Sequence, residues 1–327
     1  MMKLGVPSKG VFAMKSWISN IFSVGAVLVC TGCGDIGELD TTTPPEHYME
    51  NEATDDPMES VSEVDEFSEE WIADDMCSGE YISPEAVDRM LLLTTVSNNE
   101  DIYSTYDRID RIASLFEACG DPWGMFPTTY RHITRRIIEA IERGEIEDGD
   151  WGRAIVLDFA GRYLANLQAA LAGEMPSYAW NHYYYLADHP DASRTRAVVI
   201  AMVAHLTLDL PYALVEIDTE ESHKNDYFVL GELMIEITPD FIADLKWYYD
   251  TDAESILNGF FLGEWVDGAF GPDTTITLSY QTIRTKSWNN RWYLEQDWGT
   301  WIAESDIYAG FWLIDGVLAT LDASGAI

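Results

Sequence analysis

The chain has 327 residues, of which 47% are hydrophobic, enough for the core of one large or two ordinary domains. Acidic residues outnumber basic ones by 57 to 19, which gives a formal net charge of −38 at pH 7. Because such a surface repels phosphate groups, nucleic acids and anionic lipid headgroups are poor partners for it.

Residues 1–32 have the organisation of a secretory signal peptide. The basic stretch "MMKLGVPSKGVFAMK" precedes the apolar stretch "WISNIFSVGAVLV", which is too short to span a bilayer comfortably. The sequence "VCTGCGD" follows, and in it Gly32 directly precedes Cys33. This sequence resembles the lipobox of bacterial lipoproteins, although Cys30 stands where Leu or Val is usual. The alternatives are an ordinary cleaved signal and an uncleaved anchor.

The resemblance to a lipobox implies that the chain is exported, cleaved before Cys33 and anchored to the membrane through lipid on that thiol. Gly34 follows the cysteine, so the Asp of the inner-membrane retention signal is absent. We therefore expect a lipid-anchored protein of the bacterial cell envelope, held in the outer membrane. Its oligomeric state is not predicted.

Residues 33–79 are predicted to form a disordered acidic linker behind the lipidated cysteine. No Lys or Arg occurs between Lys15 and Arg89, and aliphatic residues are sparse there. Like charges with little apolar surface to bury cannot offset chain entropy. Of the four cysteines in the chain, Cys77 and Cys119 lie outside the signal and the lipobox-like sequence. In an oxidising compartment we expect these two to pair in a disulfide.

Residues 80–327 are predicted to form one all-α domain. Apolar residues recur there at spacings of three and four, and Ser83 before Pro84 is a typical helix start. The segment 275–283 alternates like a strand, but nothing else offers it a sheet partner, so we expect helix. About ten helices are expected, within residues 83–96, 101–118, 121–144, 150–173, 177–188, 193–210, 225–237, 238–250, 254–270 and 275–321.

Three stretches carry a family resemblance. "RIDRIASLFEACGDPWGMFPTTYRHITRRI", "AVVIAMVAHLTLDLPYALV" and "KNDYFVLGELMIEITPDF" resemble an uncharacterised bacterial family, domain of unknown function 5995. The likeness covers roughly residues 100–295, and "HLTLDLP" is its most specific part. The resemblance implies an α-helical fold and supplies no established activity.

The stretch "AVVIAMVAHLTLDLPYALV" places His205 and Asp209 one helical turn apart in the most apolar helix of the chain. Buried polar groups need a partner, so we predict that the two lie within hydrogen-bonding reach of each other or of a shared partner. Three interpretations remain open: a structural hydrogen bond, a metal site, or a histidine base oriented by its aspartate.

A metal site would use a divalent cation as cofactor, since neutral imidazole and carboxylate both suit such ions. The His-x-x-x-Asp pair is similar to the ligand pairs of zinc-dependent phospholipases C and P1-type nucleases. His132 and His182 are the histidines expected to converge on the pair. Asp226 is either a third oxygen ligand or the N-cap of its helix, and the cap is favoured.

Two classes of function follow. The first is an envelope module of unknown biochemical activity that binds a small ligand or an envelope partner through its helical domain. The alternative is a metal-dependent hydrolase of phosphoester or lipid substrates that uses His205 and Asp209. Because such a hydrolase needs more histidine ligands than the chain clearly offers, the binding module is the favoured prediction.

Overall fold

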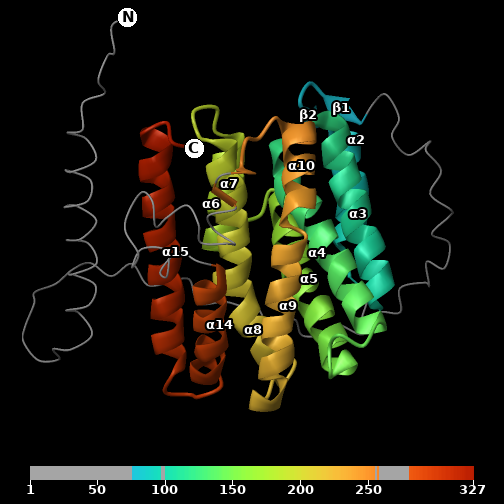
Figure 1. Cartoon of the computed structure of the whole chain (residues 1–327). Coiled ribbons are helices and arrows are strands. Elements are labelled where there is room, and N and C mark those ends of the chain that lie inside the picture. The colour runs from blue at the N-terminus through green and yellow to red at the C-terminus, as the bar shows by residue number, and fades with distance from the viewer. Residues whose placement is uncertain (1–75, 97–99, 255, 258–279) are drawn as a thin grey trace, which may run out of the picture. The chain divides into compact units, whose positions relative to one another are not determined.

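The computed structural model describes residues 76–96, 100–254, 256–257 and 280–327 (Figure 1). All of them belong to one unit, Ser68–Ile327. The predicted signal peptide, Cys33 and nearly all of the predicted linker lie outside the described residues. So do most of segment 254–270 and the first five residues of segment 275–283.

The described residues confirm an all-α fold with about ten helices. They form ten helices when α7, the turn η3 and α8 are counted as one, together with a two-stranded antiparallel sheet. The helices are α2 (Pro84–Thr94), α3 (Ile102–Cys119), α4 (Met125–Glu142), α5 (Gly149–Leu171), α6 (Tyr178–Asp188), α7 (Arg194–Ala204), α8 (Leu210–Glu216), α9 (Lys224–Glu236), α10 (Thr238–Tyr249), α14 (Tyr280–Leu294) and α15 (Thr300–Ala323). Short helical turns are η2 (Pro122–Gly124), η3 (His205–Asp209) and η4 (Glu221–His223), and the strands are β1 (Cys77–Ser78) and β2 (Tyr81–Ile82).

Local sequence signals explain where several helices begin and end. Ser83 caps α2 by accepting a hydrogen bond from the Ala86 amide, and Asp101 caps α3 by accepting from two amides of its first turn. Helix α3 ends at Cys119 and is followed by Gly120, whose φ of 69° is left-handed and therefore favours glycine. Segment 275–283 is helical where it is described, because α14 begins at Tyr280.

The continuous helix Arg194–Glu216, made of α7, η3 and α8, lies at the centre of the described domain. Helices α4, α5, α6, α14 and α15 all pack against it. It is the one helix of the described part that is long and apolar enough to cross a membrane, and 83% of its most apolar window is buried inside the domain. A helix that is apolar on every side is typical of a core position.

Cys77 and Cys119 form a disulfide that ties β1 to the last residue of α3. Their Cα atoms are 5.4 Å apart, and the two residues are separated by 42 positions in the sequence. In the chain-entropy description, closing a loop of that length stabilises the fold by roughly 4 kcal/mol. The bond therefore fixes the N-terminal edge of the described domain against the helical core.

Candidate functional site

The segment that carries His205 and Asp209 is a π-helical turn, which corrects the α-helical geometry assumed from the sequence. In η3 the amide of Leu210 donates to the carbonyl of His205, five residues earlier. Pro211 has no amide hydrogen, so the carbonyl of Leu206 lacks the corresponding donor. The Ser287 hydroxyl of α14 reaches that carbonyl instead. Turns of this kind are rare inside α-helices and are frequent at functional sites.

His205 and Asp209 are hydrogen-bonded to each other. His205 Nδ1 lies 2.9 Å from Asp209 Oδ2, and the Trp180 indole of α6 donates to the same oxygen at 2.8 Å. His205 is 3% exposed and Asp209 is 1% exposed, so both are almost completely buried. Because Oδ2 accepts the indole hydrogen, we assign the imidazole hydrogen to Nδ1, which leaves Nε2 as an acceptor.

Aromatic rings enclose the imidazole of His205. The Phe159 ring stacks on it with centroids 3.4 Å apart and planes 8° apart. Three more rings present edges or faces at near-right angles: Tyr130 at 4.9 Å, Phe126 at 5.2 Å and Trp180 at 5.8 Å. Burial lowers the pKa of His205, and the hydrogen bond and charge of Asp209 only partly offset this effect. The imidazole is therefore neutral at neutral pH.

Several polar atoms in this aromatic enclosure have no hydrogen-bond partner among the described residues. They are His205 Nε2, Asp209 Oδ1 and the hydroxyls of Tyr163 and Tyr184. Burial raises the pKa of both tyrosines well above the usual value, so their hydroxyls stay protonated and can donate. An unpartnered buried polar group costs about 1–3 kcal/mol. Leaving these four groups unpartnered therefore lowers the stability of the folded domain.

The structure does not bring His132 and His182 to the His205–Asp209 pair, contrary to the predicted convergence. His132 Nε2 lies 2.7 Å from Asp244 Oδ2 of α10. His182 Nε2 lies 3.0 Å from Asp315 Oδ2 of α15, within ion-pair distance but outside hydrogen-bonding geometry. Each of the two histidines therefore faces a carboxylate of its own.

Asp226 is neither the N-cap of its own helix nor a third ligand beside His205. Helix α9 begins two residues earlier, at Lys224. The Asp226 carboxylate accepts hydrogen bonds from the backbone amides of Glu147 at 2.9 Å and Asp148 at 2.8 Å. It holds the connection between α4 and α5 in place. Throughout the described part of the chain, no three His, Cys, Asp or Glu side chains form a group that could hold a metal ion.

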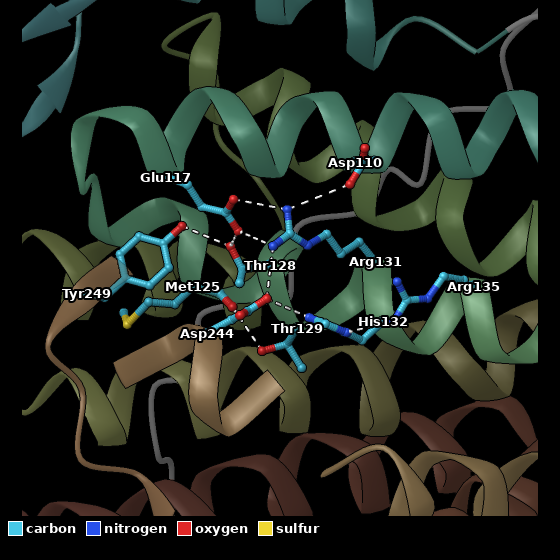
Figure 2. Close-up of polar contacts among 10 residues, drawn as sticks. All are labelled: Asp110, Glu117, Met125, Thr128, Thr129, Arg131, His132, Arg135, Asp244 and Tyr249. Atoms are coloured by element: carbon cyan, nitrogen blue, oxygen red, sulfur yellow. Dashed lines mark hydrogen bonds and ion pairs between the residues drawn. The ribbon is translucent and has the colours of Figure 1, made fainter. Parts of the chain in front are cut away.

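His132 belongs to a network of polar side chains that joins α3, α4 and α10 (Figure 2). Arg131 lies at its centre and donates to Glu117 at 3.0 Å and to Asp244 at 2.9 Å. Glu117 also accepts from Thr128 at 2.7 Å. Burial alone would raise the pKa of Asp244, but hydrogen bonds and charge from His132 and Arg131 lower it overall. Since these groups satisfy one another, the network serves to fasten three helices.

A narrow apolar pocket lies next to the aromatic enclosure. Its cavity volume is about 40 Å³, within an empty volume of about 500 Å³ that includes space open to solvent. Tyr130, Phe159 and Leu206 belong to its wall and also adjoin the His205 turn. The other lining residues are Ile133, Thr134, Ile137, Ile155, Val156, Leu210, Tyr227, Leu230, Met234 and Arg284. The sequence did not reveal this pocket, because its wall is assembled from five helical segments.

The chain belongs to a family of unknown function, DUF5995, whose model matches residues 102–302. The matched range contains the π-helical turn, the aromatic enclosure and every residue of the pocket wall. No curated protein and no solved structure matches the chain.

Proposed function

We propose that the chain is a lipid-anchored bacterial envelope protein whose helical domain binds an apolar small molecule in the pocket beside the His205 turn. The pocket is the observation that carries this proposal. Among the thirteen described residues that line it, twelve are uncharged and come from α4, α5, α9 and the η3–α8 segment, and the thirteenth is Arg284 of α14. Ligand sites are typically concave and mostly apolar, with a few polar groups that orient the ligand.

The partners of the candidate polar residues support binding rather than hydrolysis. His132, His182 and Asp226 each have partners away from His205. A metal-dependent hydrolase needs several ligands around one ion. The described residues supply only the His205–Asp209 pair at this position. We therefore favour the binding module over the hydrolase.

Binding of straight-chain alcohols of increasing length to the purified protein tests this function. Each buried methylene contributes about 0.8 kcal/mol, so affinity should rise about fourfold per added carbon until the pocket is full. Calorimetric titration would give the affinities.

A matched pair of variants locates the binding. Met234 lines the pocket, so Met234→Trp should fill it and lower the affinity at least about tenfold, as expected when a bulky side chain takes the ligand's place. Met175 is 79% exposed and lies outside the pocket, so Met175→Trp should leave the affinity unchanged. Affinities that do not depend on chain length, or that fall equally in both variants, would contradict the proposal.

A further inference from the structure

Three aromatic side chains lie together on the surface where α14 turns into α15, at one end of the described helices (Figure 1). They are Trp292, Tyr293 and Trp298, and we call them the aromatic patch. The ring centroids of Trp292 and Tyr293 are 5.0 Å apart, and that of Trp298 lies 5.7 Å and 6.2 Å from them. The three ring planes are inclined to one another by 75–89°, so the rings meet edge to face.

The turn that carries the aromatic patch is tight. The Gln296 amide donates to the Tyr293 carbonyl at 3.1 Å, and the Gly299 amide donates to the Gln296 carbonyl at 2.7 Å. A Cβ atom at position 299 would lie 2.4 Å from the Tyr293 carbonyl oxygen, so glycine is required there. Because the backbone holds the rings in place, a partner that binds them loses little affinity to ordering the turn.

The aromatic patch does not belong to the core. Trp288, one turn earlier on α14, is 4% exposed and packs against the Tyr227 ring with centroids 4.9 Å apart. Trp292 is 46% exposed and Trp298 is 57% exposed. Apolar surface left in water forgoes the stabilisation that burial provides, and a cluster of such side chains is typical of an interaction surface.

The charges around the aromatic patch are negative. Residues 292–327 contain six acidic residues and neither Lys nor Arg. Two of the acids, Glu295 and Asp297, lie in the turn between the aromatic residues. Glu295 lies 3.8 Å from Arg291, whereas Asp297 is exposed and forms no ion pair within the described part of the chain. Ring faces beside carboxylates are complementary to a cation.

We propose that the aromatic patch docks an arginine-rich segment of a partner protein. A guanidinium stacks on aromatic faces and also pairs with carboxylates, and the turn presents both groups. Trp, Tyr and Arg are the residues that contribute most to the affinity of protein interfaces. The net charge of −38 attracts a basic segment and repels an anionic one. No residue of the patch lines the apolar pocket, so this inference is independent of the proposed ligand.

Octa-arginine, octa-lysine and octa-citrulline, which share a length, test the inference on the purified full-length protein. Guanidinium stacks on rings better than ammonium does, so the wild type should bind octa-arginine at least about threefold more tightly than octa-lysine. Citrulline is a neutral isostere of arginine, so octa-citrulline should show no binding. Calorimetric titration at about 0.15 M salt measures all three affinities.

Two variants test the role of the rings. Each exposed cation–π contact strengthens binding by a factor of about two to five, so Trp292→Ala combined with Trp298→Ala should weaken octa-arginine binding at least about fivefold. Trp247→Ala is the control and should leave the affinity unchanged, because that side chain is 81% exposed on α10, outside the patch. Thermal unfolding verifies that each variant is folded.

A second pair of variants tests the local charge. Asp297→Asn should weaken octa-arginine binding about twofold. Asp191→Asn removes the same charge near the other end of α15, where the Ser193 amide donates to Asp322, and should have no effect. A helix as long as α15 spans about 36 Å, and surface charges are screened over about 8 Å.

Hydrogen exchange of the wild type locates the contact without any variant. Octa-arginine should slow amide exchange in residues 292–301 more than elsewhere. The proposal is wrong if octa-arginine does not bind, if it protects another segment instead, or if Trp247→Ala weakens binding as much as the double variant does. Chitotetraose is the probe for a neutral glycan. If it binds the wild type and not the double variant, the patch holds a sugar and the proposal is equally wrong.

Discussion

Burial controls the charge of His205, and this has a consequence for stability. In the unfolded chain the imidazole takes up a proton near its ordinary pKa of 6.5, whereas in the folded protein its pKa is lowered. Below pH 6.5 the unfolded state therefore binds more protons than the folded state. The contribution of His205 to stability is fully present above that pH and is lost as the pH falls.

The substitution His205→Asn tests this linkage, because the amide nitrogen can occupy the place of Nδ1 but does not titrate. At pH 8 the variant should be less stable by about 1–3 kcal/mol, since it loses ring packing and has an imperfect hydrogen bond. The difference in unfolding free energy should shrink as the pH falls from 6.5 to 5, by up to about 1.4 kcal/mol per unit. Urea unfolding at each pH measures it. A difference that is independent of pH would show that the folded and unfolded states titrate alike.

The sequence predicted the contact between His205 and Asp209 but not the residues around it. Spacing along one helix shows which side chains share a turn, and that was enough to place the carboxylate beside the imidazole. The partners Trp180 and Phe159 belong to other helices, so no local pattern could identify them. Arg284 was missed for the same reason: an arginine on an otherwise polar helix gives no sign that it is buried.

At the scale of elements, the π-helical turn depends on a hydroxyl from a different helix. The Ser287 hydroxyl lies close to the carbonyl of Leu206 and also to that of Ile283 in its own helix. Pro211 removes the amide that would otherwise serve Leu206. The proline was visible in "HLTLDLP", but the switch from α to π geometry was not. It becomes apparent only when every backbone carbonyl of the turn is assigned a donor.

A double-mutant cycle between Ser287 and Pro211 tests this account. Ser287→Ala should lower the unfolding free energy by about 1–3 kcal/mol, because it leaves a buried carbonyl unpaired. In a Pro211→Ala background the cost should be smaller, since the restored amide can serve Leu206. Ser305→Ala is the control, because that hydroxyl donates to the Trp301 carbonyl of its own helix at an exposed position. If Ser287→Ala lowers the unfolding free energy equally with Pro211 and with Pro211→Ala, the Ser287 hydroxyl does not replace the missing amide as the donor to Leu206.

At the scale of the whole molecule, helical periodicity predicted the class of fold well, since capping and spacing are local signals. Ser83 and Asp101 begin helices where their sequence context indicates. The arrangement of the helices around Arg194–Glu216 was not predicted. It depends on which apolar faces meet, and many pairings of amphipathic helices satisfy the same pattern.

The proposed membrane anchor leads to a prediction about location. Cys33→Ser removes the only thiol that a lipobox-type cleavage would expose, so the protein should leave the membrane fraction and lose acyl labelling. Cys30→Ser is the matched control and should change neither property. Fractionation and labelling of both variants measure the effect. Retention of the Cys33→Ser protein in membranes with its label intact would show that the anchor lies elsewhere.

The disulfide also determines how the domain responds to a pulling force. A load applied through the chain before Cys77 enters the fold at that residue, and the bond passes it directly to Cys119 at the end of α3. The residues between them, including all of α2, lie outside the loaded path. After reduction the same load would act first on β1, β2 and α2, which can peel away one after another. With the disulfide formed, the domain therefore resists a force applied from its N-terminal side as a single unit.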